Sequence, residues 1–177
     1  MDRLRVENPQ SPRNVVAEHW HCKTESRPVD IIFDWEIANF TRRLETCSQG
    51  NVVQSDKFFS EINADTHWYL RLYPKGQLNL KGSDEHSMGL YLHVGRIQED
   101  ELVVKFKFSL LDVAGNVAYS QPLIVHSYSL LKRNNCAFGY PSFIKHSQLF
   151  SGGDLLPNGT LTIRCQLEYQ VESTETW

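Results

Sequence analysis

The chain has 177 residues, of which 41% are hydrophobic and 22% charged, a composition typical of a single globular domain. Its 18 basic and 21 acidic residues give a formal charge of −3, and the basic residues are scattered, which argues against a basic field for nucleic acid or membrane. The N-terminus lacks an apolar signal segment, and no apolar run approaches the ~20 residues needed to span a bilayer. We therefore expect a soluble intracellular protein, nuclear or cytoplasmic.

The pattern of apolar and polar residues divides the chain into three parts. Residues 1–28 are polar and contain several prolines without a hydrophobic period, which predicts a flexible leader. Residues 29–170 alternate apolar and polar side chains and are expected to form the folded domain. Residues 171–177 are polar and read as a frayed tail.

Strand signals dominate the middle part of the chain. Period-two alternation, which marks a half-buried strand, occurs at residues 31–37, 68–73, 90–94, 102–110 and 161–167. Each of these segments places its larger apolar side chains on one face.

Turn sequences separate these strands, at residues 114–116 and 157–159. Only residues 141–149 have a helical pattern, enough for one or two turns. No regular alternation of strands and helices appears, which argues against a parallel sheet. The sequence therefore predicts an all-β fold, an antiparallel β-sandwich of about eight strands with one short helical turn.

Sequence motifs for catalysis are missing. The chain has no G-x-S-x-G, P-loop, G-x-G-x-x-G or H-E-x-x-H motif. The run His19-Trp20-His21-Cys22 lacks the second pair of ligands that a structural zinc site needs. A catalytic triad assembled from distant residues stays open at this point. We expect a protein without enzymatic activity, cofactor or metal.

A few aromatic residues have no evident place in the core. Tyr91 alternates with two leucines and should face outward if they face inward. Phe138 and Tyr140 flank Gly139 in a loop-like segment. Neighbouring exposed aromatics are typical of protein-binding surfaces, and the alternative is that each residue is only the rim of the core.

An ordered set of segments resembles the MATH (meprin and TRAF homology) domain, most closely that of speckle-type POZ adaptor proteins. The matching segments are WEIANF at 35–40, SDKF at 55–58, WYLRLYPKG at 68–76, LYL at 90–92, KFKFS at 105–109, FGYPSFI at 138–144 and LLPNGTLTIRC at 155–165. They follow the family order with family-like spacing from about residue 29 to residue 168.

The resemblance implies a shallow groove across one sheet that receives an extended peptide in the manner of a β-strand. In speckle-type adaptors the bound motif runs apolar, polar, Ser, Ser/Thr, Ser/Thr. The groove residues of that family fall here on Tyr91, Phe106, Tyr128, Phe138, Gly139 and Tyr140. Because Phe106 shares a strand face with Phe108, it is either the floor of this groove or part of the core.

One departure from the family bears on specificity. The family has a Lys-Asp pair just before its groove tryptophan, where this chain has Cys136-Ala137 before Phe138. The missing carboxylate removes an acceptor for a serine hydroxyl, which leaves the serine-rich preference open. Phe138 stands where the family has its groove tryptophan, and Tyr140 stands where it has a phenylalanine. The groove therefore stays aromatic, and peptide binding itself is expected to persist.

The resemblance also implies a role. Speckle-type adaptors recognise substrate proteins through short linear peptides and recruit a cullin ubiquitin ligase through a BTB/POZ domain. No such domain fits before Trp177, so a ligase link requires that one follows in the full protein. The alternatives are a TRAF-like signalling adaptor, which the lack of heptads disfavours, a meprin-like extracellular domain, which the lack of a signal peptide disfavours, and a free-standing MATH protein.

Overall fold

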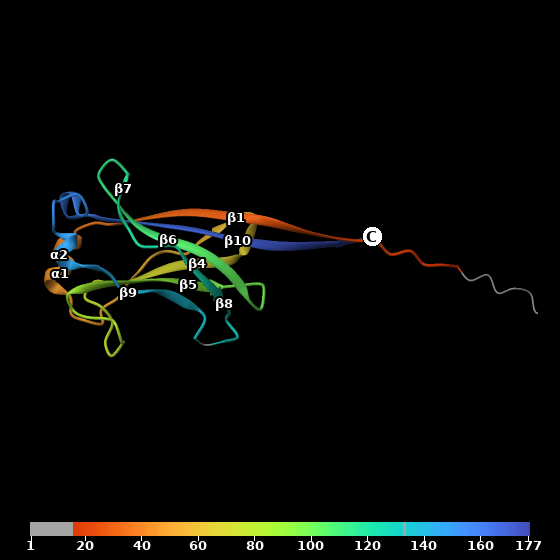
Figure 1. Ribbon diagram of the computed structural model, residues 1–177, viewed down its shortest axis with the longest axis horizontal. Helices are drawn as coiled ribbons and strands as arrows, with labels where there is room; N and C mark the ends of the chain where they lie inside the picture. The colour runs from red at the N-terminus through yellow and green to blue at the C-terminus, as the bar shows by residue number, and fades with distance from the viewer. Residues whose placement is uncertain (1–15, 133) are drawn as a thin grey trace, which may run out of the picture.

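The computed structural model describes residues 16–132 and 134–177, which form two antiparallel sheets packed face to face (Figure 1). Sheet A contains β1 (Cys22–Ile37), β10 (Leu161–Thr176), β6 (Leu102–Leu111), β7 (Val117–Ser120) and β8 (Ile124–Tyr128). Sheet B contains β2 (Val53–Gln54), β3 (Phe58–Ser60), β4 (Asn63–Tyr73), β5 (Ser87–Arg96) and β9 (Ala137–Lys145). The predicted antiparallel sandwich is confirmed, with two five-stranded sheets in the described residues. The strand number exceeds eight because short pieces such as β2 and β3 pair along β4.

The core lies between the two sheets and is rich in aromatic rings. Strand β6 shows how alternation builds it, since its apolar residues from Leu102 to Leu110 are buried at every second position. From sheet B, the fully buried Trp68 meets the ring of Tyr128 edge-on, with 5.1 Å between ring centroids. Phe108 and Phe143 make a similar edge contact across the sheets at 6.1 Å. Removal of this apolar surface from water is the main force holding the sheets together.

One helix was not predicted from the sequence. Helix α1 (Phe40–Thr46) begins after Asn39, whose φ of 55° is left-handed. Its buried residues Phe40 and Leu44 are four apart and lie on one helix face. A single apolar pair at this spacing is too short a pattern to stand out in a sequence of alternating strands.

The helix expected at residues 141–149 is mostly wrong. Strand β9 occupies this segment up to Lys145, and only α2 (His146–Leu149) is helical. Pro141 lacks a backbone N–H and is tolerated in β9 because β9 is an edge strand. A single 3₁₀ turn, η1 (Pro157–Gly159), precedes β10. None of the helices in the described part of the chain has the length and apolarity that crossing a bilayer requires.

The paired strands at the two ends of the described residues extend past the domain boundaries expected from the sequence. Strands β1 and β10 pair along their whole length, from Cys22 opposite Thr176 to Ile37 opposite Leu161. Strand β6 accompanies β10 only as far as Tyr169, so the ends of β1 and β10 project from the sandwich as a two-stranded ribbon (Figure 1). Both faces of the ribbon meet solvent, which is why its sequence is polar and shows no period. The first part of the expected leader, residues 1–15, lies outside the described residues.

Candidate functional site

Strand β9 forms an open edge of sheet B. On one side it pairs with β5, and no other strand of residues 16–132 and 134–177 pairs with it. On its open side the Phe143 carbonyl accepts hydrogen bonds from the Tyr119 hydroxyl and the Gln121 amide, both at 2.9 Å. These side-chain donors occupy the C-terminal half of the edge, and the described residues place no strand against the half at residues 137–140.

Phe138 and Tyr140 turn toward sheet A, because they pair with leucines of β5 that face the core. Phe138 is 44% exposed and stacks on His126 of β8, with ring centroids 4.3 Å apart and planes 19° apart. The Tyr140 hydroxyl donates to the Pro122 carbonyl at 2.8 Å. These contacts connect the open edges of the two sheets. We call the surface formed by His126, Phe138 and Tyr140 the β8–β9 edge.

His126 is a member of this surface that sequence reasoning missed. Its Nε2 is buried and has no hydrogen-bond partner in the described part of the chain, and burial lowers the pKa of His126. The neutral ring lies flat against Phe138 and edge-on to Tyr128, 4.8 Å between centroids. The alternation of Ile124, His126 and Tyr128 along β8 could have revealed it, since all three share the inner face.

Two of the predicted groove residues, Phe106 and Tyr128, lie in the core instead. Both are 0% exposed. Phe106 packs edge-on against Phe108, with 5.2 Å between ring centroids. Of the two places that the sequence allowed for Phe106, groove floor or core, this contact agrees with the core. The Tyr128 hydroxyl donates to the Leu92 carbonyl at 3.0 Å, and burial raises the pKa of Tyr128 well above its usual value. Neither side chain reaches the surface, although the Tyr128 ring supports His126 from below.

Gly139 is required by the close approach of β9 to β5. A Cβ atom at this position would lie 2.1 Å from the Leu90 carbonyl oxygen and 2.7 Å from the Tyr91 Cα. Both neighbours are backbone atoms, which cannot rotate away, so only glycine fits here. Gly139 therefore leaves the backbone of β9 bare at this point and offers no side chain for contact with a ligand.

Tyr91 lies directly opposite Gly139, on the outer face of sheet B. Its ring stands perpendicular to that of Tyr73, with 5.8 Å between centroids. Burial and the neighbouring Tyr73 raise the pKa of Tyr91 to about 12. The hydroxyl oxygen is shielded and has no hydrogen-bond partner among the described residues. The structure thus separates Tyr91 and Gly139, on the outer face, from Phe138 and Tyr140 at the adjacent edge.

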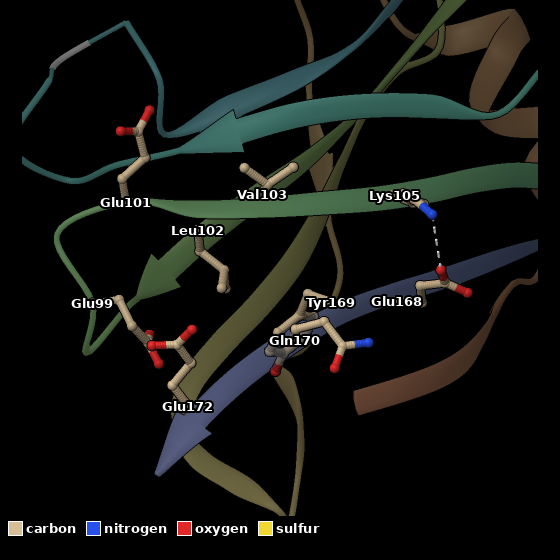
Figure 2. Close-up of a pocket in the computed structure, with 9 residues that line it drawn as sticks. All are labelled: Glu99, Glu101, Leu102, Val103, Lys105, Glu168, Tyr169, Gln170 and Glu172. Atoms are coloured by element: carbon tan, nitrogen blue, oxygen red, sulfur yellow. Dashed lines mark ion pairs between the residues drawn. The ribbon is translucent and has the colours of Figure 1, made fainter. Parts of the chain in front are cut away.

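A separate hollow of the described residues lies away from this edge. Figure 2 shows this hollow, of about 460 Å³, on the outer face of sheet A, where β6 and β10 part. Its walls carry Glu99, Glu101 and Glu172, and an ion pair of 3.4 Å joins Lys105 to Glu168 at its rim. Across residues 16–132 and 134–177, no group of three or more His, Cys, Asp or Glu side chains is placed to hold a metal ion.

The described residues thus form a two-sheet antiparallel β-sandwich with one large ring, Phe138, exposed at an open sheet edge. When the sequence is compared with known protein families, residues 32–167 match the MATH domain. The chain belongs to the MATH domain family, as its ordered sequence segments predicted. MATH domains are protein-interaction modules, so the partners of this chain are proteins.

Proposed function

We propose that this chain binds short extended segments of other proteins at the β8–β9 edge. The observation that supports this most strongly is Phe138, a large ring that is 44% exposed on an edge strand. An open strand edge offers peptide groups for hydrogen bonding, and an adjacent exposed ring offers apolar contact area. These are the two requirements for recognising a peptide that adds to a sheet as a further strand.

The division of the predicted residues between two faces fits this mode. A strand lying along β9 turns alternate side chains to opposite faces. One set of ligand side chains would meet Phe138, Tyr140 and His126 at the edge. The other set would lie over Gly139 toward Tyr91 on the outer face. Phe106 and Tyr128 then act from the core, as support for the site.

The ligand we propose carries an apolar residue followed by Ser/Thr-rich positions, as the resemblance to speckle-type adaptors implies. The apolar side chain would pack on the Phe138 ring. Ala137 offers no carboxylate to a serine hydroxyl, so the hydroxyl residues would bond mainly to peptide groups of β9. The preference for serine is accordingly expected to be weaker than in the family.

We further propose that the chain is the substrate-recognition part of a cullin-type ubiquitin ligase adaptor, acting in the nucleus or cytoplasm. The support is the close resemblance of its ordered segments to speckle-type adaptors. A TRAF-like signalling adaptor or a free-standing MATH protein without a ligase link is the alternative. Co-purification of a cullin with the full-length protein supports the first role, and its absence, with peptide binding retained, favours the alternative.

Fluorescence anisotropy of a labelled apolar-polar-Ser-Ser-Ser peptide tests the binding site. We expect a Kd in the micromolar range, about −8 kcal/mol, and at least about tenfold weaker binding by Phe138→Ala, because truncation of a central aromatic contact costs well over 1 kcal/mol. Phe150→Ala is the matched control, since Phe150 is 53% exposed and directly follows α2, which lies at the opposite end of the sandwich from β8 (Figure 1). Equal binding by Phe138→Ala and the wild type would overturn the assignment of the site.

A further inference from the structure

Two neighbouring strands of sheet A carry aliphatic side chains on their outward as well as their inward faces. Residues 102–104 of β6 are Leu-Val-Val, and residues 123–125, where β8 begins, are Leu-Ile-Val. A continuous apolar run of this kind is typical of a strand covered on both sides, whereas a strand with one solvated face alternates apolar and polar residues. The inward residues pack in the core, but more than half of each outward side chain, at Val103, Leu123 and Val125, is exposed.

The three exposed aliphatic side chains are neighbours on the sheet. In the register of β6 with β8, Val125 lies opposite Lys105, and Val103 is the next outward residue along β6. Leu123 precedes Val125 by two positions and points to the same face. Side chains at such diagonal positions lie within about 7 to 8 Å of each other. A contiguous group of exposed apolar side chains marks an interaction surface, whereas a single one needs no explanation.

The hollow in Figure 2 adjoins this aliphatic group at Val103 and adds negative charge to it. Glu99 and Glu172 lie at one end of the hollow, and the ion pair between Lys105 and Glu168 lies at the other (Figure 2). Neither Glu99 nor Glu172 has an ion-pair partner among the described residues. The Oε2 atom of Glu99 is also shielded from solvent and has no hydrogen-bond partner there. This end of the hollow therefore holds negative charge that the described part of the chain does not balance.

The chemistry that complements this face is a basic side chain beside apolar ones. Lys and Arg carry positive charge at pH 7, and their N–H groups would give Glu99 and Glu172 the donors that the described residues do not supply. Their long apolar stems can lie along Val103 while the charged head reaches the carboxylates. An acidic segment would be repelled from the same hollow. We call Glu99, Val103, Leu123, Val125 and Glu172 the sheet A surface.

We propose that the sheet A surface binds a second protein, through a segment in which a Lys or Arg lies next to aliphatic residues. The basic side chain enters the hollow at Glu99 and Glu172, and the aliphatic side chains pack on Val103 and Val125. This surface is separate from the β8–β9 edge, because the outward residues of β8 point away from His126 on its inner face. The inference goes beyond the proposed function and does not depend on it, and both surfaces can be occupied at once.

Amide chemical-shift titrations with a short basic peptide test this surface. The probe is acetyl-Arg-Ala-Leu-Ala-Leu-amide, in which an extended chain turns the arginine and both leucines to one face at a spacing of about 7 Å. One reference peptide has Gln in place of Arg, and the other has Ser in place of both Leu. We expect saturable shifts at residues 99–105, 123–125 and 170–172 with a Kd of about 1 mM. Each reference should bind about tenfold more weakly, for lack of the charge-assisted contact or of the apolar area.

Four variants assign the binding to this surface. Glu172→Gln removes one carboxylate, and Val125→Thr exchanges a methyl group for a hydroxyl; each should weaken binding of the probe about threefold. The matched controls are Glu45→Gln and Val113→Thr, because both side chains are exposed and lie outside the sheet A surface. Glu45 lies on α1, at the opposite end of the sandwich from the hollow (Figure 1). Neither control should change the affinity.

The outcomes distinguish this surface from the β8–β9 edge. If the probe causes no saturable shift, or binds no better than its Gln reference, the inference is overturned. Equal weakening by Glu172→Gln and Glu45→Gln would assign the binding to net charge and overturn it too. Self-association of the wild type in sedimentation velocity, abolished by Val125→Thr, would show that a second copy covers this face instead of a different protein. The apolar-polar-Ser-Ser-Ser peptide should bind Glu172→Gln as tightly as the wild type, so failure of one site leaves the other standing.

Discussion

Replacing Gly139 with alanine is expected to destabilise the fold by about 3 kcal/mol, because the new Cβ would overlap the backbone of β5. The atoms in its way are the Leu90 carbonyl oxygen and the Tyr91 Cα, at 2.1 and 2.7 Å. Neither can move without separating β9 from β5. Urea unfolding followed by tryptophan fluorescence measures the loss, and peptide binding at the β8–β9 edge should weaken with it.

Gly115→Ala separates steric overlap from backbone strain. Gly115 has a φ of 82°, and no atom lies within 4 Å of a Cβ built on it. Its replacement should therefore cost only the left-handed backbone penalty, roughly 1 to 2 kcal/mol. If Gly139→Ala is no more destabilising than Gly115→Ala, the close approach of β9 to β5 is contradicted.

Truncation of Phe106 to alanine is expected to cost about 3 to 5 kcal/mol, as for other fully buried phenylalanines. The ring is 0% exposed and touches Phe108 and Tyr128 between the sheets. The milder Phe106→Leu fills more of the same space and should leave a folded protein at room temperature. Thermal unfolding of both variants measures the stability loss.

Peptide affinity distinguishes a core role of Phe106 from a groove role. Because its ring does not reach the surface, Phe106→Leu should bind the peptide of the proposed function as tightly as the wild type. Phe138→Ala should show the reverse pattern, with weak binding and little loss of stability, since its ring is 44% exposed. If the folded Phe106→Leu variant bound the peptide clearly more weakly than the wild type, Phe106 would have to be part of the binding surface.

The sequence predicted the faces of the strands well because period two reports burial directly. Leu102 to Leu110 of β6 and Trp68 to Leu72 of β4 bury the residues that alternation selected. The same rule failed for the ribbon of β1 and β10, where pairing depends on backbone hydrogen bonds and both faces are polar. Residues 22–28 and 171–176 therefore read as leader and tail although the structure pairs them.

The candidate site was less predictable, because its geometry depends on where the edges of two sheets meet. Alternation places His126 and Tyr128 on one face of β8 but does not say which of them lies nearer the surface. The family resemblance places a groove residue at Tyr128, and the structure buries this side chain beneath His126. Likewise, the separation of Tyr91 from Phe138 follows from the pairing register of β5 with β9, which no local pattern reveals.

The most direct test of the account is a titration of ¹⁵N-labelled protein with the apolar-polar-Ser-Ser-Ser peptide, followed by amide chemical shifts. The account predicts that the largest changes fall at residues 124–128 and 137–140, with smaller changes at Tyr91. The hollow on the outer face of sheet A, around Glu99 and Glu172, should remain unaffected. Changes concentrated in that hollow, with residues 137–140 unperturbed, would contradict peptide binding at the β8–β9 edge.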